Sequence, residues 1–178
     1  MRDVLKNKKG FTLVELLAVI VILALIMGIA VVAMSGVIEN SKKNSALTTA
    51  ASLIDGVRKK LMVDANIKTG TTSYYFTNAI LERGGVTSPL GGNYAYITPD
   101  SDGKVTGATK VTSGLYEITG TAPVCTASAK SYVTVTVADG SPTTYTICLT
   151  SGATESYISG NENQLLQKDY TVIKNPTA

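Results

Sequence analysis

Residues 9–38 read KGFTLVELLAVIVILALIMGIAVVAMSGVI, and they contain the longest apolar stretch of this 178-residue chain. From Leu16 to Ile38, 23 consecutive residues include no charged, Asn or Gln side chain. A helix needs about 20 apolar residues to cross the hydrocarbon core of a bilayer. We therefore expect residues 11–38 to form a helix that lies in a membrane or in the core of a helical assembly.

The net positive charge of the chain comes from its first ten residues. The whole chain carries a net charge of +3, and from Phe11 onward 12 basic residues balance 12 acidic ones. The charged residues before Phe11 are Arg2, Asp3, Lys6, Lys8 and Lys9. Basic residues beside a membrane span hold their end of the chain in the cytoplasm. The composition therefore indicates a single-pass protein with its N-terminus inside and its C-terminus outside, and no specific nucleic-acid partner.

An amphipathic half follows the apolar stretch. In residues 39–65, apolar side chains recur at steps of three and four, which places them on one face of a helix. A continuous helix over residues 11–65 would be roughly 80 Å long, at about 1.5 Å per residue. A small domain cannot bury that length, so only the second half is expected to pack on its own chain. The expected stripe consists of Leu47, Ala50, Ile54, Val57 and Leu61.

The remainder of the chain has the alternating pattern of half-buried strands. In residues 132–137, Val133, Val135 and Val137 alternate with threonines, which is typical of an antiparallel strand with one face on a core. The predicted fold class is therefore α+β, with a long helix, hydrophobic and then amphipathic, packed on a C-terminal antiparallel sheet. The other expected strands are 94–98, 115–119 and 143–149.

The expected organisation assigns residues 39–178 to a globular head. Within it, residues 66–93 are expected to connect the helix to the sheet, with a short helix at 78–83 closed by glycine. The sheet is expected over residues 94–150. Residues 151–178 are rich in Gly, Ser and Asn, so they are expected to be mostly loop, with a last strand at 170–174.

The start of the apolar stretch resembles a known processing signal. Gly10 and Phe11, with Glu15 as the fifth residue after the glycine, resemble the class III signal of type IV prepilins and pseudopilins. The resemblance implies cleavage between Gly10 and Phe11 by a prepilin peptidase, removal of the leader 1–10, and N-methylation of Phe11. An ordinary secretory signal differs, because it is cut after its apolar stretch, which is then discarded.

Glu15 is the acidic residue of the expected membrane segment. A carboxylate in a membrane helix costs about 2.5 to 3.5 kcal/mol at the helix centre and less near an end, so it usually marks a function. The resemblance implies that Glu15 pairs with the α-amine of Phe11, on the same or a neighbouring subunit, during assembly. The alternative is that Glu15 lies at the headgroup level and stabilises the positive end of the helix dipole.

One position departs from the pattern of many pilins. These pilins have a proline about twenty residues into the mature helix, and the matching position here is Val32. Gly28 and Gly36 are the helix-weakening residues nearby, each costing about 1 kcal/mol relative to Ala. A kink is therefore expected at one of these glycines.

The two cysteines, Cys125 and Cys148, would lie outside the cell, where disulfides persist. Cys148 falls on the threonine side of its strand, away from Ile147 and Leu149, which argues against a thiol in an apolar core. We expect a disulfide between them, with two free thiols as the alternative.

The remaining candidates for chemistry are weak. Asp100 and Asp102 resemble a fragment of a calcium loop, but the spaced glutamate of such a loop is missing, and a plain turn is the preferred interpretation. The chain has no His, and no catalytic Ser/His/Asp set, paired carboxylates or phosphate loop is recognisable. We therefore expect no cofactor and no enzymatic activity.

Three functions are compatible with these patterns. The resemblance implies a structural subunit, of the major type, of a type IV pilus that serves adhesion, motility or aggregation. Its partners would be identical subunits, the prepilin peptidase and methyltransferase, and the pilus assembly platform. The chain would lie in the cell membrane before assembly and in an extracellular filament afterwards. The alternatives are a pseudopilin of a type II secretion or DNA-uptake system, and a membrane-anchored surface domain that never polymerises.

Overall fold

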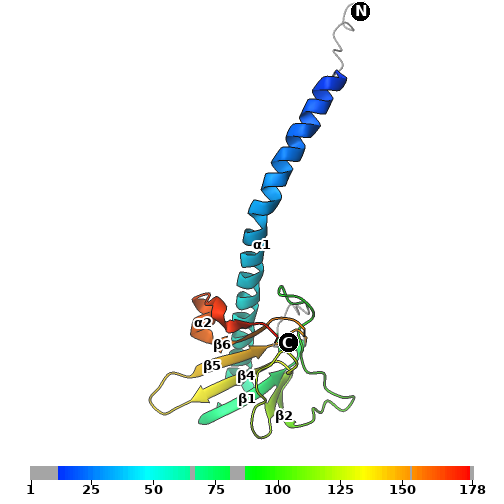
Figure 1. Cartoon of the computed structure of the whole chain (residues 1–178). Helices are drawn as coiled ribbons and strands as arrows, with labels where there is room; N and C mark the ends of the chain where they lie inside the picture. The colour runs from blue at the N-terminus through cyan, green and yellow to red at the C-terminus, as the bar shows by residue number, and fades with distance from the viewer. Residues whose placement is uncertain (1–11, 65–66, 81–86, 153, 177–178) are drawn as a thin grey trace, which may run out of the picture. The chain divides into compact units, whose positions relative to one another are not determined.

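The computed structural model describes residues 12–64, 67–80, 87–152 and 154–176 (Figure 1). The chain forms two compact units, residues 1–40 and 41–178. We call the second unit the head. Helix α1 (Leu13–Asp64) is 52 residues long and supplies residues to both units. The single long helix predicted from the sequence is thereby confirmed over the described residues.

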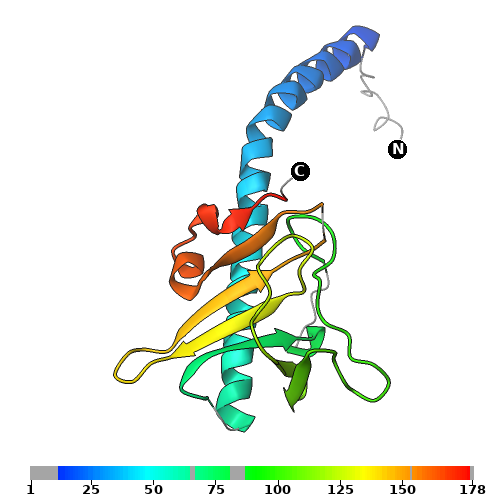
Figure 2. The ribbon, with the colours of Figure 1, turned by 60° about the horizontal axis from the view of Figure 1, so that its bottom comes forward.

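The head is built on the C-terminal part of α1. The predicted apolar stripe is confirmed, because its five side chains are at most 3% exposed. The three- and four-residue spacing brings them to one face of the helix, where they pack against the sheet. Ala46 and Leu53 are buried in the same core. Figure 2 shows this part of α1, in cyan, behind the strands.

Within the described residues, the sheet has seven strands in the order β2-β3-β1-β4-β5-β6-β7, and every neighbouring pair is antiparallel. The side chains that alternate toward α1 form the main core, which includes Val133, Ile147 and Leu149 as predicted. The strands are β1 (Gly70–Phe76), β2 (Ala108–Thr112), β3 (Leu115–Ile118), β4 (Tyr132–Val137), β5 (Thr144–Leu149), β6 (Tyr157–Asn161) and β7 (Ile173–Lys174).

Strand β1 corrects the prediction that residues 66–93 only connect helix and sheet. It lies inside the sheet and pairs with both β3 and β4. Its sequence, GTTSYYF, has its large apolar side chains only at the end, so the alternation that marks a strand is weak. Tyr74 and Phe76 nevertheless bury their rings in the core. The predicted short helix at 78–83 is the 3-10 turn η1 (Asn78–Ile80), and residues 81–86 lie outside the described part.

The strand predicted at 94–98 is wrong. The Ala95 N–H donates to the Thr150 carbonyl over 2.7 Å, and the Ser131 N–H donates to the Ala95 carbonyl over 2.9 Å. These partners lie just outside β5 and β4, so the segment crosses strand ends instead of following one strand. Tyr94 and Ile97 are buried, but they are three residues apart, so burial in this segment does not follow the two-residue period of a strand.

The C-terminal region contains more regular structure than the predicted loops. Strand β6 is followed by α2 (Glu162–Leu166), and the 3-10 turn η2 (Tyr170–Val172) precedes β7. The predicted strand at 170–174 therefore holds only for its last two residues. A reciprocal capping box starts α2, with Asn161 and Gln164 each accepting from the other's backbone N–H.

Arg58 joins α1 to α2. Its guanidinium donates to the Glu162 carboxylate, at 2.6 Å from Nη2 to Oε2, and to Asp55 Oδ1 at 2.6 Å. It also lies over the Tyr145 ring, 4.5 Å from the centroid. The Arg58 and Glu162 side chains are 27% and 25% exposed, so the pair is partly shielded from water and salt.

We expect Glu162→Gln to lower the free energy of unfolding by about 1 kcal/mol, because a partly shielded charge pair contributes more than an exposed one. The measurement is urea unfolding of the full chain in detergent, followed by tyrosine circular dichroism. Asp55→Asn is the matched control, because Asp55 is 57% exposed, and it should cost less than about 0.5 kcal/mol. Equal losses in the two variants would contradict this account of the Arg58 contacts.

Candidate functional site

The predicted processing site lies at the edge of the described structure. Gly10 and Phe11 are outside the described residues, so the expected cleavage and methylation remain predictions. The described chain begins at Thr12, and α1 begins one residue later. Glu15 is therefore in the first turn of the helix.

Thr12 and Glu15 form a reciprocal capping box. The Thr12 N–H and its hydroxyl both donate to Glu15 Oε2 over 2.9 Å, and the Glu15 N–H donates to Thr12 Oγ1 over 3.3 Å. The first N–H groups of a helix have no partner within the helix, and this arrangement satisfies two donors at once. Our sequence reasoning missed the role of Thr12, although the pattern Thr-x-x-Glu before an apolar stretch is its known signature.

The capping box holds the Glu15 carboxylate at the positive end of the helix dipole, where a negative charge is favourable. These contacts agree with the dipole interpretation of Glu15. The pairing with the Phe11 amine is not tested, because Phe11 lies outside the described residues. The two roles use the same carboxylate group, which has acceptor sites for more than one donor.

The first half of α1 presents apolar side chains on all sides. Its large apolar residues from Leu13 to Ile38 are between 47% and 80% exposed. Exposed apolar surface of this extent marks a membrane or protein contact. Among the described residues, α1 is the one helix long and apolar enough to cross a membrane, judged by length and composition.

The candidate kink lies within regular helix. Helix α1 continues through Gly28 and Gly36, and a Cβ added at either would meet nothing within 4 Å. The Ser35 hydroxyl donates to the Val32 carbonyl over 2.9 Å, a local bond that can bend a helix. A kink at these glycines remains a prediction.

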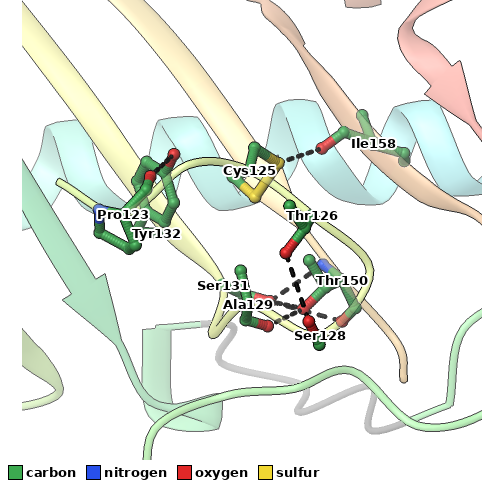
Figure 3. The surroundings of a disulfide bond; sticks show 10 residues. Pro123, Cys125, Thr126, Ser128, Ala129, Ser131, Tyr132, Thr150 and Ile158 are labelled. Atoms are coloured by element: carbon green, nitrogen blue, oxygen red, sulfur yellow. Dashed lines mark hydrogen bonds between the residues drawn. A yellow bond between two sulfur atoms is a disulfide. The ribbon is translucent and has the colours of Figure 1, made fainter. Parts of the chain in front are cut away.

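The predicted disulfide between Cys125 and Cys148 is present, with the Cα atoms 5.6 Å apart (Figure 3). Cys148 lies on the sheet face opposite α1, which we call the outer face. There it forms a second apolar cluster with Ile118 and Tyr132. The bridge therefore fastens the segment 119–131, which links β3 to β4, onto the outer face.

Hydrogen bonds reinforce the same segment. The Tyr132 hydroxyl donates to the Pro123 carbonyl over 2.6 Å, and the Thr150 hydroxyl donates to the Ala129 carbonyl over 2.7 Å (Figure 3). Burial raises the pKa of Tyr132, so this hydroxyl stays protonated and remains a donor at any physiological pH. The segment is therefore held at Pro123, at Ala129 and, between them, by the disulfide at Cys125.

The weak calcium candidate is accounted for by a turn. Asp100 Oδ1 accepts from the backbone N–H of Asp102 over 3.0 Å and from that of Lys104 over 2.7 Å. Gly103 has a φ of +72°, a value that favours glycine. Within the described residues, no group of three or more His, Cys, Asp or Glu side chains is placed to hold a metal ion.

Comparison with protein families identifies the N-terminal segment. Residues 5–31 match the family model of the prokaryotic N-terminal methylation motif. The chain carries the class III signal of type IV pilins and pseudopilins. This pilin signal includes Gly10, Phe11 and Glu15, so the resemblance stated from the sequence is confirmed. No curated protein and no solved structure matches the chain. The long helix on an antiparallel sheet is consistent with the pilin fold.

We expect the double variant Cys125→Ser/Cys148→Ser to lower the free energy of unfolding by about 3 kcal/mol, because the bridge restricts the unfolded chain. The two cysteines are 23 residues apart. Urea unfolding of the full chain in detergent, with and without reductant, measures the difference. Reduced wild-type protein should match the variant, and an unchanged unfolding midpoint under reductant would contradict the prediction.

Proposed function

We propose that this chain is a structural subunit, of the major type, of a type IV pilus. The observation that carries the proposal is the combination of the class III signal with an apolar helix that continues directly into the core of a folded head. A plain membrane anchor needs the apolar stretch but not its continuation as a regular helix. A subunit that leaves the membrane and packs into a filament needs the apolar stretch and also its continuation as a helix that carries the head.

Processing prepares the chain for this role. Cleavage after Gly10 removes the basic leader, and the retained 168 residues are formally neutral, since 12 basic and 12 acidic side chains remain. The apolar helix then has no basic flank to hold it at the cytoplasmic face. N-methylation of Phe11 by the same peptidase and methyltransferase follows. Copies of the chain then add, through an assembly platform, to an extracellular homopolymer.

Glu15 sets the register between subunits in this proposal. The amine of Phe11 and the Glu15 carboxylate would both be costly in an apolar filament core unless they pair. Pairing neutralises both groups and favours one axial step between neighbouring helices. The role of the subunit is structural and requires no catalytic step of its own.

A pseudopilin of a type II secretion or DNA-uptake system is the second candidate, because the methylation motif supports pilins and pseudopilins equally. A major pilus subunit gives abundant surface filaments, and a pseudopilin does not. A membrane-anchored domain that never polymerises is the outcome in which the precursor is processed but no filament forms.

We expect the protein recovered from cells to have lost residues 1–10 and gained one methyl group, measured by intact-mass spectrometry. Filaments sheared from the cell surface should consist mainly of this chain. Abundant sheared filaments support the pilus subunit. Processed protein without sheared filaments favours the pseudopilin or the anchor, and an unprocessed N-terminus would overturn both pilin-type functions.

Variants at Glu15 separate its charge from its capping role. Glu15→Ala removes both, whereas Glu15→Gln can still accept from Thr12 in a capping box but carries no charge. We expect both variants to be processed and membrane-bound, and both to give at least about tenfold fewer sheared filaments, because neither can neutralise the Phe11 amine.

Thr12→Val is the matched control, because it removes only the hydroxyl that takes part in the cap. We expect it to form filaments at close to the wild-type yield, quantified by immunoblot of sheared fractions. Normal yield for Glu15→Gln would contradict the register role and would leave Glu15 as a helix cap.

A further inference from the structure

The outer face of the sheet carries an ordered set of hydroxyl groups. Strands β1, β4 and β5 each place two Thr or Ser side chains on this face, and the pairing register aligns them in two rows. Neighbouring strands lie about 4.8 Å apart, so hydroxyls in a row are adjacent. The first row is Thr71, Thr136 and Thr144, and the second is Ser73, Thr134 and Thr146.

The hydroxyls of β1 and β4 bond to one another and keep further capacity. Ser73 Oγ and Thr134 Oγ1 are 2.7 Å apart, and Thr71 Oγ1 and Thr136 Oγ1 are 3.2 Å apart. A hydroxyl has one donor and two acceptor sites, so each bonded pair still offers one donor and three acceptors. This surface therefore suits a ligand with both donors and acceptors.

A cavity of about 480 Å³ lies over one end of this hydroxyl surface. Thr71, Ser73 and Thr134 line it from the sheet, and residues 120–122 of the segment that follows β3 line it from the other side. Its volume is within the range of small-molecule sites. Thr121 adds a fourth hydroxyl group, whereas Thr72 alternates to the α1 face of β1, and Ile118 and Ala122 add apolar surface.

The lining of the cavity offers no cationic partner to an anion, because none of its residues is Lys or Arg. Glu117 is among the lining residues, but it pairs with Tyr74 across β1 and β3, so its side chain lies on the α1 face of the sheet. The Glu117 carboxylate accepts from Lys68 Nζ over 2.7 Å, so its charge is compensated from outside the lining. A phosphate or an acidic sugar would lack a cationic partner here. A neutral ligand needs no cationic partner.

The wall of the cavity is fixed by contacts already described. Ala122 packs on the second apolar cluster beside Cys125, and the disulfide holds that segment on the outer face. A preorganised wall lowers the entropy cost of binding. The segment that carries residues 120–122 is therefore tied to the sheet close to the cavity.

We propose that this cavity binds a neutral carbohydrate. The hydroxyls of Thr71, Ser73 and Thr134 exchange hydrogen bonds with the hydroxyls of a sugar ring, and Ile118 and Ala122 contact its C–H groups. About one or two sugar units match the volume. This site lies wholly in the head, so it goes beyond the proposed filament role and does not depend on assembly.

The test uses the full chain in a polyoxyethylene detergent, which has no sugar headgroup, on an immobilised panel of neutral oligosaccharides such as maltotriose, chitobiose and N-acetyllactosamine. Sialyllactose is the acidic comparison. Ser73→Ala/Thr134→Val removes a bonded hydroxyl pair from the cavity and leaves neither partner unsatisfied. Thr144→Val/Thr146→Val is the matched control, because both hydroxyls are on the same face but outside the cavity lining.

We expect at least one neutral oligosaccharide to bind, with affinity about tenfold or more weaker in the cavity variant and within about twofold of wild type in the control. Thr121→Val, in the exposed wall, should also weaken binding without affecting the fold. Unfolding midpoints verify that each variant is folded. No binding at millimolar concentration, preference for sialyllactose, or equal losses in the cavity variant and the control would each overturn the proposal.

Discussion

The apolar surface of residues 13–38 is the constraint on which the rest of this protein depends. Its large side chains stay about half exposed or more in the described chain, and exposed apolar area costs about 25 cal/mol per Å² in water. That cost is removed only by lipid or by other helices. The same helix also forms part of a folded head. Its N-terminal half therefore needs an apolar environment on all sides, whereas its C-terminal half needs one on a single face.

In the head, α1 buries one face, the apolar stripe, against the sheet. The stripe on α1 covers one face of the sheet, and Arg58 and the disulfide add further links to α2 and to the segment 119–131. The sheet edges are unsuited to pairing with another copy. Edge strand β2 is bulged next to Lys110, and edge strand β7 has two residues. In the proposed filament, association between copies would therefore fall to the helix, and the outer face would stay available for other contacts.

In the proposed filament, Glu15 would serve both the local fold and the assembly. Within one chain its carboxylate caps α1 together with Thr12, which holds the charge at the helix start. In an apolar assembly the same charge would need a cationic partner, and the nearest candidate in the sequence is the amine that the proposed cleavage would create at Phe11. The cap thus holds the Glu15 carboxylate near the helix start, where the proposed pairing with the Phe11 amine would need it.

The sequence by itself determined the long helix, its buried stripe, strands β3 to β5 and the processing signal, because these depend on periodicity or on short motifs. Tertiary structure alone decided the place of β1 in the sheet, the crossing path of residues 94–98 and the contact between Arg58 and Glu162. That pair is 104 residues apart in the chain. Local patterns carry no information about such distant partners, so burial and hydrogen bonding in the folded head settle them.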